Sequence, residues 1–150
     1  MPASNVVIRP IRTDERAEWE PLWKGYQAFY EVVISDATTA VTWARLHDPA
    51  EPMGVLGAYV DDRLCGIVHY LFHRSCWTTG DYCYLQDLFV AAGARKLGLG
   101  RGLIEAVEER ARAAGASRVY WLTHETNAGA RALYDKVAEH PGFIQYRKVF

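Results

Sequence analysis

The sequence predicts a single α/β domain of the α+β type, in which helices flank a mixed, mostly antiparallel central sheet. Two observations predict this fold class. Three strand-like segments follow one another between residues 54 and 90 with short polar links, which is typical of antiparallel strands. An amphipathic helix and a further apolar strand come next, which adds a parallel strand pair. A chain of 150 residues and 17.0 kDa has room for one hydrophobic core, so residues 1–150 are expected to form one domain.

The N-terminal third is predicted to hold one strand and two helices. Residues 6–9 are an apolar segment that a proline ends. Thr13 is expected to cap a helix that runs to about Tyr30, because acidic residues follow Thr13 at the positive end of the helix dipole. A weaker helix pattern covers about residues 38–48. The first helix carries a broad apolar face at three- and four-residue spacing, made of Trp19, Leu22, Trp23, Tyr26, Phe29 and Tyr30.

The middle of the chain predicts a three-stranded meander. Residues 54–60 and 63–72 are expected to pair as a hairpin across Asp61 and Asp62, since aspartate tolerates the backbone conformations of tight turns. Residues 82–90 form the third predicted strand, after a polar link.

A βαβ unit and two further elements complete the predicted topology. The helix of this unit ends at Gly115, and residues 119–123 return as a strand parallel to residues 82–90. A last helix is expected over about 128–137, and residues 143–149 are expected to be a final strand. The helix of the βαβ unit is marked by one apolar stripe of Leu103, Ile104, Val107, Ala111 and Ala114.

Composition excludes several classes of protein. With 17 Lys and Arg against 18 Asp and Glu, the net charge of −1 gives no field that would attract nucleic acid. Three cysteines without a C-x-x-C pair indicate neither a disulfide framework nor a zinc ribbon, and the histidines follow no zinc-binding spacing, so no metal is expected. The first ten residues lack a signal-peptide pattern, and no apolar stretch is long enough to span a membrane. We expect a cytoplasmic protein that binds neither nucleic acid nor membrane.

A glycine-rich segment lies at the junction between the 82–90 strand and the following helix. Three glycines within five residues, Gly98, Gly100 and Gly102, let the backbone approach a ligand, and the helix start offers unpaired N–H groups to an anion. The arginine and lysine side chains in this segment add positive charge, which favours binding of a pyrophosphate. Glycines that serve only as turn residues are the simpler alternative. The segment lacks the Gly-Lys-Ser/Thr of a P-loop and the third glycine of a dinucleotide-binding loop.

A second pair of residues follows the returning strand. Asn127 and Tyr134 lie seven residues apart at the start of the last helix, on nearly the same face. Taken alone, Asn127 is a helix cap and Tyr134 a core aromatic. Because both follow the second strand of the βαβ unit, they are expected to converge with the glycine segment at the carboxyl ends of the two parallel strands.

These residues resemble the GNAT superfamily of N-acetyltransferases over nearly the whole chain. Residues 95–100, Arg-Lys-Leu-Gly-Leu-Gly, match its acetyl-CoA loop, Asn127 and Tyr134 match its Asn-then-Tyr helix, and residues 84–90 resemble the strand before the loop. The resemblance implies an acetyl-CoA-dependent enzyme in which the parallel strands splay apart and Tyr134 gives a proton to the departing sulfur. No histidine lies at a spacing that would activate one of the three cysteines, so no acyl-enzyme is expected. The implied cofactor-binding residues are Leu88, Phe89, Val90, Arg95, Lys96, Leu97, Gly98, Leu99, Gly100, Arg101, Asn127 and Tyr134.

The chain looks most like the branch with spermidine/spermine acetyltransferases and the fungal histone and polyamine acetyltransferases. That branch carries a glutamate, the proposed base, where this sequence has Gln86, and an amide cannot accept the proton. Gln86 remains a candidate site residue, with Asp87, Glu31 or a water as the substitute base, unless the amine arrives already neutral.

The acceptor implied by this branch is a primary amine on a small cationic molecule, polyamine-like or amino-acid-like. Its predicted binding residues are aromatic, to attract an ammonium group, or acidic, to pair with a second one. A protein or histone lysine acetyltransferase and a non-catalytic acyl-CoA-binding module remain alternatives. The aromatic content and the resemblance also predict a homodimer. The candidate acceptor residues are Tyr26, Tyr30, Glu31, Trp77 and Asp81.

Overall fold

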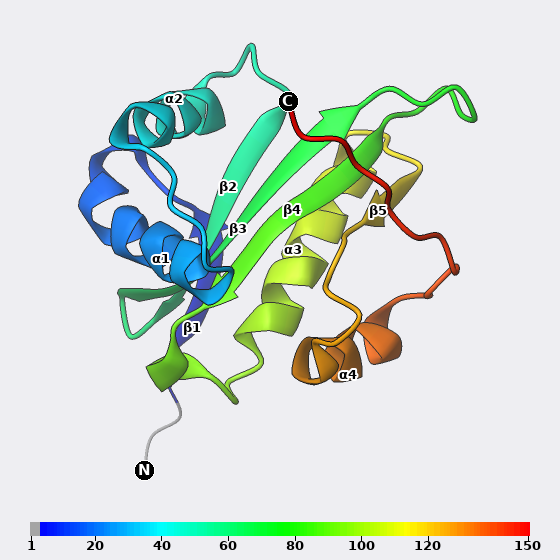
Figure 1. Cartoon of the computed structure of the whole chain (residues 1–150). Coiled ribbons are helices and arrows are strands. Elements are labelled where there is room, and N and C mark those ends of the chain that lie inside the picture. Colours follow the sequence, from blue (N-terminus) through cyan, green and yellow to red (C-terminus); the bar gives the residue numbers. More distant parts are fainter. Residues whose placement is uncertain (1–3) are drawn as a thin grey trace.

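A computed structural model describes residues 4–150 of the chain (Figure 1). Five strands form one sheet in the order β1-β2-β3-β4-β5, with antiparallel neighbours except for the parallel pair β4 and β5. The predicted fold class is therefore confirmed. The elements are β1 (Val6–Pro10), the 3₁₀ turn η1 (Thr13–Glu15), α1 (Arg16–Phe29), α2 (Asp36–His47), β2 (Met53–Val60), β3 (Arg63–His73), β4 (Tyr82–Val90), the 3₁₀ turn η2 (Ala92–Ala94), α3 (Leu99–Ala113), β5 (Arg118–Tyr120) and α4 (Ala128–Val137).

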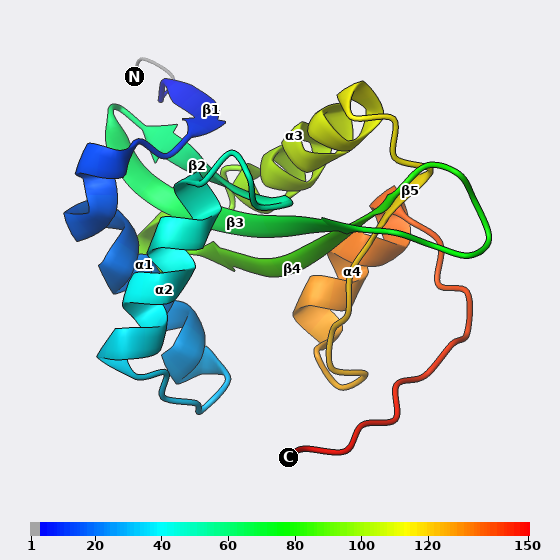
Figure 2. The same cartoon turned by 90° about the horizontal axis from the view of Figure 1, so that it is seen from above.

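Helices cover both faces of the sheet, as Figures 1 and 2 show together. On one face, α1 and α2 bury a core with three tryptophans, Trp19, Trp23 and Trp43. On the other face, the apolar stripe of α3 packs on β2, β3 and β4, and residues of α4 add to its edge. The two faces of the sheet therefore bear two different cores, and the face that a buried residue of β4 takes decides which groups it meets.

Several predicted boundaries are confirmed. β4 and α4 have the predicted limits, and the turn between β2 and β3 consists of Asp61 and Asp62 with φ values of 48° and 67°. These left-handed conformations at both turn positions match the twist of a two-residue hairpin, and aspartate tolerates them better than most residues.

Two predicted helix starts differ in the structure. Thr13 does not cap α1: it lies within η1, whose N-cap is Arg12, and the Arg12 N–H donates to the Glu15 carboxylate at 2.9 Å. The Glu15 carboxylate thus accepts a backbone N–H at the start of η1, and the Thr13 hydroxyl does not serve as a cap. α2 begins at Asp36, earlier than predicted, because the Ser35 side chain accepts a hydrogen bond from the Thr38 N–H.

The C-terminal part differs most. β5 is three residues long, shorter than the predicted strand over 119–123. Residues 143–149 are not a strand but an extended, irregular segment, and their large apolar side chains are exposed. A strand pattern needs a free edge to pair with, and β5 offers too short an edge to hold this segment.

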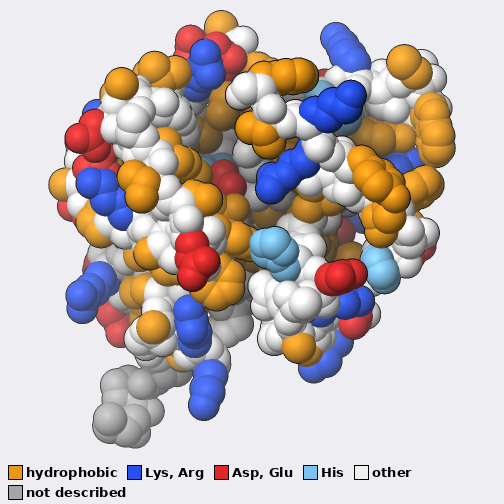
Figure 3. Space-filling model, viewed as in Figure 1, with side chains coloured by type: hydrophobic (Ala, Val, Ile, Leu, Met, Phe, Trp, Pro, Cys, Tyr) orange, Lys and Arg blue, Asp and Glu red, His pale blue; other side chains and the backbone are white. Residues whose placement is uncertain are grey.

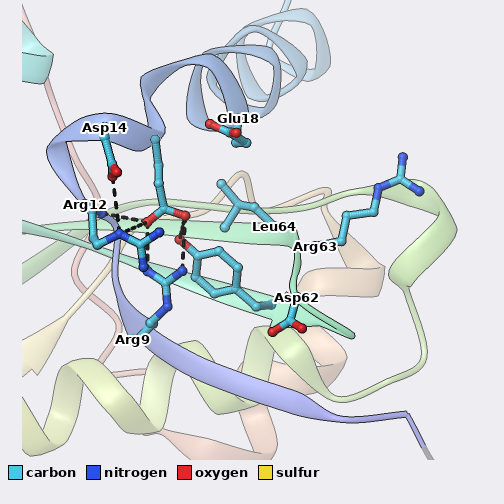
Figure 4. A pocket seen from close by; sticks show the side chains of 9 residues that line it. Arg9, Arg12, Asp14, Glu18, Asp62, Arg63 and Leu64 are labelled. Carbon is cyan, nitrogen blue, oxygen red and sulfur yellow. Dashed lines mark hydrogen bonds and ion pairs between the residues drawn. The ribbon is translucent and has the colours of Figure 1, made fainter.

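A group of charged side chains joins neighbouring elements at one edge of the molecule (Figure 4). The Arg9 guanidinium donates to both oxygens of Glu15 at 2.8 and 3.1 Å, and the Tyr59 hydroxyl donates to Glu15 at 3.0 Å. Arg9 also lies over the Tyr59 ring, 3.8 Å from its centroid. This Arg9–Glu15–Tyr59 clamp links β1, η1 and β2 beside a hollow of about 530 Å³. Because Arg9 and Tyr59 satisfy the buried carboxylate of Glu15, the clamp has a structural role.

Candidate active site

β4 and β5 separate where the candidate site begins. Their parallel pairing covers only Tyr82–Tyr84 of β4 against Arg118–Tyr120 of β5. From Leu85 to Val90, β4 pairs with β3 on one side and with no strand of residues 4–150 on the other. Backbone groups on the unpaired side of β4 are therefore available to a ligand next to the glycine segment. This agrees with the splayed strand pair expected from the sequence.

The start of α3 offers a cradle for an anion. Gly98 caps the helix with φ of 73°, and no atom lies within 4 Å of the position where a Cβ would stand. The first backbone bond of the helix joins the Gly102 N–H to the Gly98 oxygen, so the N–H groups of Leu99, Gly100 and Arg101 precede it without a side-chain cap in the described chain. Unpaired N–H groups at the positive end of a 15-residue helix favour a phosphate.

Cationic side chains surround this cradle. Arg95, Lys96 and Arg101 are exposed, and Lys96 holds a left-handed φ of 72°. Arg101 also pairs with Glu105 at 3.1 Å. Leu97 is exposed beside them, whereas Leu99 is buried in the core and anchors the loop. The predicted pyrophosphate residues are thus brought together on one loop.

Tyr134 lies close to this loop on α4. Leu133, its neighbour, is 3.6 Å from the position of a Cβ on Gly100, so α4 packs against the start of α3. The Tyr134 ring meets Trp121 edge to face, with centroids 5.4 Å apart. Burial, with the nearby Tyr30 as a smaller cause, raises the pKa of Tyr134 above 10.0. The phenol therefore stays protonated at neutral pH and can act as a proton donor.

Asn127 performs the helix-capping role expected of it. Its side-chain oxygen accepts from the Ala130 N–H at 3.3 Å, and its amide nitrogen donates to the Thr123 hydroxyl at 3.5 Å. These bonds fix the turn between β5 and α4.

Asp87 is the buried carboxylate of the site. It is 8% exposed, and its Oδ2 lies 3.0 Å from His69 Nδ1. Burial, then the charge of Asp87 and hydrogen bonding to it, raise the pKa of Tyr26. Burial and the charge of Asp87 likewise raise the pKa of Tyr30. Tyr26 of α1 and Tyr30, which directly follows this helix, therefore interact electrostatically with this carboxylate.

A β-bulge at Gln86 explains the direction of Asp87. His69 pairs with Asp87, whereas the next residue of β3, Tyr70, pairs with Leu85, so Gln86 is an extra residue in β4. An extra residue reverses the alternation of side chains along a strand. Leu85 faces the α3 core before the bulge, and Asp87 faces α1 after it, while Gln86 is exposed.

A hollow of about 370 Å³ opens between the end of α1 and the turn before α4. The Tyr30 ring stacks on His124 across it, with centroids 6.0 Å apart. Glu31 follows with φ of 55° and an exposed side chain. Since Tyr30 lies near both Asp87 and Tyr134, this hollow, lined by Phe29, Tyr30, Glu31, His124, Thr126 and Asn127, is the candidate acceptor site.

The structure does not bring Trp77 and Asp81 to this hollow. Both lie in the connection between β3 and β4, at the opposite end of β4 from the glycine loop. Trp77 is 79% exposed, and Asp81 pairs with Arg74 of the same connection at 3.3 Å.

The comparisons with known proteins agree with this geometry. The sequence model of the acetyltransferase (GNAT) family matches residues 18–138. The chain belongs to the GNAT family of N-acetyltransferases. A relative from Saccharomyces cerevisiae, the D-amino-acid N-acetyltransferase HPA3, is 35% identical over 95% of this chain and 90% of its own length. A Caenorhabditis elegans thialysine N-epsilon-acetyltransferase is 32% identical over 53% of this chain and 49% of its own length.

Solved structures share the GNAT fold. A ribosomal-protein-alanine N-acetyltransferase from Brucella melitensis biovar Abortus 2308 superimposes with a TM-score of 0.82 at 21% identity, covering 97% of this chain and all (100%) of the other. The aminoglycoside N-acetyltransferase AAC(6')-Iy, in complex with CoA, gives 0.83 at 18% identity, covering 98% and 97%.

His69 and His124 are not among the candidate site residues identified from the sequence. The apolar residues around His69 in β3 were a usable signal, because a histidine in a buried strand needs hydrogen-bond partners. No signal pointed to His124.

Within residues 4–150, no three metal-ligating side chains gather to hold an ion, and no helix could cross a membrane. Cys83 is buried, which raises its pKa to about 11 and makes it a poor nucleophile.

Proposed function

We propose that this enzyme transfers an acetyl group from acetyl-CoA to a primary amine of a small cationic molecule, polyamine-like or amino-acid-like. One observation carries the proposal: Tyr30, which lines the hollow together with Glu31, interacts electrostatically with both the buried carboxylate of Asp87 and the phenol of Tyr134. A carboxylate, aromatic rings and a protonated phenol are the groups that acetyl transfer to an ammonium substrate needs.

The cradle at α3 fits acetyl-CoA. The three uncapped N–H groups and the space above Gly98 suit a pyrophosphate, and Arg95, Lys96 and Arg101 supply charge. The free side of β4 at Leu88, Phe89 and Val90 offers backbone groups to the amide-bearing arm of the cofactor. When bound, acetyl-CoA supplies the acetyl thioester.

The roles of the catalytic side chains follow from their surroundings. Asp87 attracts the ammonium form of the acceptor and accepts its proton, directly or through water. Backbone N–H groups at Leu88 or Phe89 stabilise the developing oxyanion. The Tyr134 hydroxyl gives its proton to the leaving sulfur. Gln86, exposed at the bulge, orients the acceptor as a hydrogen-bonding amide.

The acceptor wall matches a molecule with a second charge. Tyr26 and Tyr30 present aromatic rings, 4.9 Å apart between centroids, and Glu31 adds an exposed carboxylate at the rim. The names of the two relatives, which act on D-amino acids and on thialysine, support an amino-acid-like amine as the acceptor.

A panel assay tests this function. Purified protein is mixed with acetyl-CoA and one acceptor at a time, and free thiol is measured. The acceptors are diamines, D- and L-amino acids, thialysine and a histone-tail peptide. We expect turnover with small amines well above that with the peptide. Activity confined to peptide lysines would overturn the small-amine assignment, and acetyl-CoA binding without turnover on any acceptor would identify a binding module.

The homodimer predicted from the sequence also finds support. The side chains of the extended C-terminal segment include Phe143, Ile144, Tyr146, Val149 and Phe150, each at least 74% exposed. Hydrophobic groups lie along the upper right of the face in Figure 3, where this segment passes in Figure 1. A second copy of the chain would remove this apolar surface from water.

A further inference from the structure

Asp87 is the end of a buried chain of hydrogen bonds that starts in α1. Trp19 Nε1 lies 3.0 Å from His69 Nε2, and His69 Nδ1 lies 3.0 Å from Asp87 Oδ2. Trp19 is 0% exposed and His69 is 2% exposed, so water does not compete for these bonds. The three residues come from α1, β3 and β4, and each faces the tryptophan core because of its place on its element.

The chemistry of the three groups fixes the protonation of the imidazole. An indole N–H is a donor only, so His69 Nε2 must be its acceptor and carries no proton. The remaining ring proton is then on Nδ1, where it is donated to Asp87. A second proton on the ring would break the bond from Trp19. Trp19 therefore selects the neutral tautomer that donates to the carboxylate.

This arrangement has two consequences for Asp87. Its Oδ2 is bound to a fixed donor, so the plane of the carboxylate is set rather than free to rotate. Because the ring is neutral, the negative charge of Asp87 is not cancelled by an imidazolium and remains available to a cation. The rings of Trp23, 4.8 Å from His69 between centroids, and of Trp19 hold the imidazole from the α1 side.

We propose that His69 is a positioning residue for acetyl transfer: held in its neutral form by Trp19, it orients the Asp87 carboxylate toward the acceptor amine. The proposal rests on the proposed function, since it assigns His69 a role through Asp87. His69 itself touches no reactant. The prediction is specific to the Nδ1 proton, because Nδ1 is the atom of the imidazole ring that lies within hydrogen-bond distance of Asp87.

Two substitutions at His69 separate positioning from packing. His69→Leu removes the donor to Asp87. His69→Asn keeps an N–H donor at the position of Nδ1, since both atoms are bonded to Cγ. Val55→Ala is the matched control, because Val55 lies opposite His69 in the sheet, is buried in the same core and donates to nothing near Asp87.

We expect His69→Leu to lower kcat for the amine by about 10–100-fold, the usual effect of losing a group that orients a ligand, while the KM for acetyl-CoA changes less than about twofold. His69→Asn should recover most of the loss, and Val55→Ala should keep nearly full kcat. Equal kcat in His69→Leu and Val55→Ala, or no recovery with His69→Asn in folded protein, would overturn the positioning role.

Nitrogen NMR of histidine-labelled protein tests the hydrogen-bond chain without turnover. The signals that vanish in His69→Leu identify the His69 ring, and we expect this ring to have a protonated Nδ1 and a bare Nε2 in the wild type and to shift to a tautomer mixture in Trp19→Phe. A protonated Nε2 on this ring in the wild type would overturn the proposal. A wild type that shows the expected tautomer but acetylates no amine would instead reject the proposed function, and the positioning role with it.

Discussion

Tyr134 is the proposed proton donor, and its surroundings suit that role. Its ring is packed against Trp121, and burial raises the pKa of its phenol, so the proton is retained until it is needed. A thiolate with an ordinary pKa of ~8.5 is a weaker base than such a phenolate, so the proton moves to sulfur as the C–S bond breaks and negative charge would otherwise build up there. The phenolate left on Tyr134 then takes up the proton that the acetylated nitrogen loses, which restores the phenol.

Replacing Tyr134 with Phe removes this proton and little volume. We expect turnover to fall by roughly 10²–10⁴-fold, the range of general acid catalysis, while affinity for acetyl-CoA persists. Steady-state kinetics and calorimetry measure the two quantities. Tyr146→Phe, which removes a hydroxyl from an exposed ring, is the control. Near-normal turnover in Tyr134→Phe would return this residue to a packing role.

Glu31 lies at the rim of the acceptor hollow and is predicted to hold a distal charge. Glu31→Gln should raise the apparent KM for a diamine more than for a monoamine, because only the diamine has a second ammonium group to lose its partner. Glutamine keeps the side-chain length and suits the left-handed backbone at this position about as well. Glu109→Gln, an exposed change on α3, is the control. Equal effects on both amines would reject the polyamine-like acceptor.

At the scale of elements, the start of α3 joins three independent features. The left-handed Gly98, the uncapped N–H groups and the cations coincide because the chain turns from β4 into α3 within a few residues. Each feature alone is common in proteins, and their coincidence is what favours a pyrophosphate.

Changing both Gly98 and Gly100 to Val tests this loop. A Cβ at Gly98 would enter the space above the cradle and oppose the left-handed φ, so we expect binding of acetyl-CoA to be lost in a folded protein. Calorimetry measures the affinity and circular dichroism the fold. Gly93→Val is the control, since the space around Gly93 is open and its φ is not left-handed. Unchanged affinity in the folded double variant would show that the loop assignment is wrong.

The Arg9–Glu15–Tyr59 clamp makes stability depend on pH. Hydrogen bonds from Arg9, opposed by burial, lower the pKa of Glu15 from 4.5 to about 2. A depressed pKa in the folded state contributes stability above pH 4.5, and this contribution is lost as the pH falls from 4.5 through about 2.

Glu15→Gln should therefore lower the free energy of unfolding at pH 7 by about 1–3 kcal/mol, since it leaves Arg9 without its carboxylate. The difference from the wild type should shrink below pH 4.5. Urea unfolding at pH 7, 5, 4 and 3 measures it, with Glu109→Gln as a surface control. A difference that stays constant over this range would show that Glu15 carries no charge-dependent stability.

At the scale of the molecule, the exposed C-terminal segment is the feature that predicts association. We expect light scattering at micromolar concentration to report twice the 17.0 kDa mass of the chain. Ile144→Asp combined with Val149→Asp should shift the protein toward 17.0 kDa, because charged side chains would oppose burial of the segment. A wild type that already scatters as one chain would end the dimer hypothesis.

Most of the fold was predictable from local patterns. The alternation in β4, the apolar stripe of α3 and the two aspartates of the hairpin turn each act within a few residues, so their effect can be seen in the sequence. The glycine loop and the Asn127 cap were predictable for the same reason. The failed strand over 143–149 had the right residues, but no edge long enough to pair with, and pairing partners are not a local property.

The sequence by itself determined the order of the elements, the family and the loop proposed to hold the pyrophosphate. Tertiary structure decided which carboxylate is available to the proposed site. One extra residue at Gln86 turns Asp87 from the α3 core to the α1 side, and because both faces of β4 carry apolar side chains, the sequence does not show where the alternation reverses. The partners that hold Asp87 come from far along the chain: His69 lies 18 residues away, and Trp19 lies 50 residues from His69. Hydrogen bonds over such separations exist only once the strands and α1 have packed, which is why the sequence named Asp87 as a candidate but could not reveal what holds it.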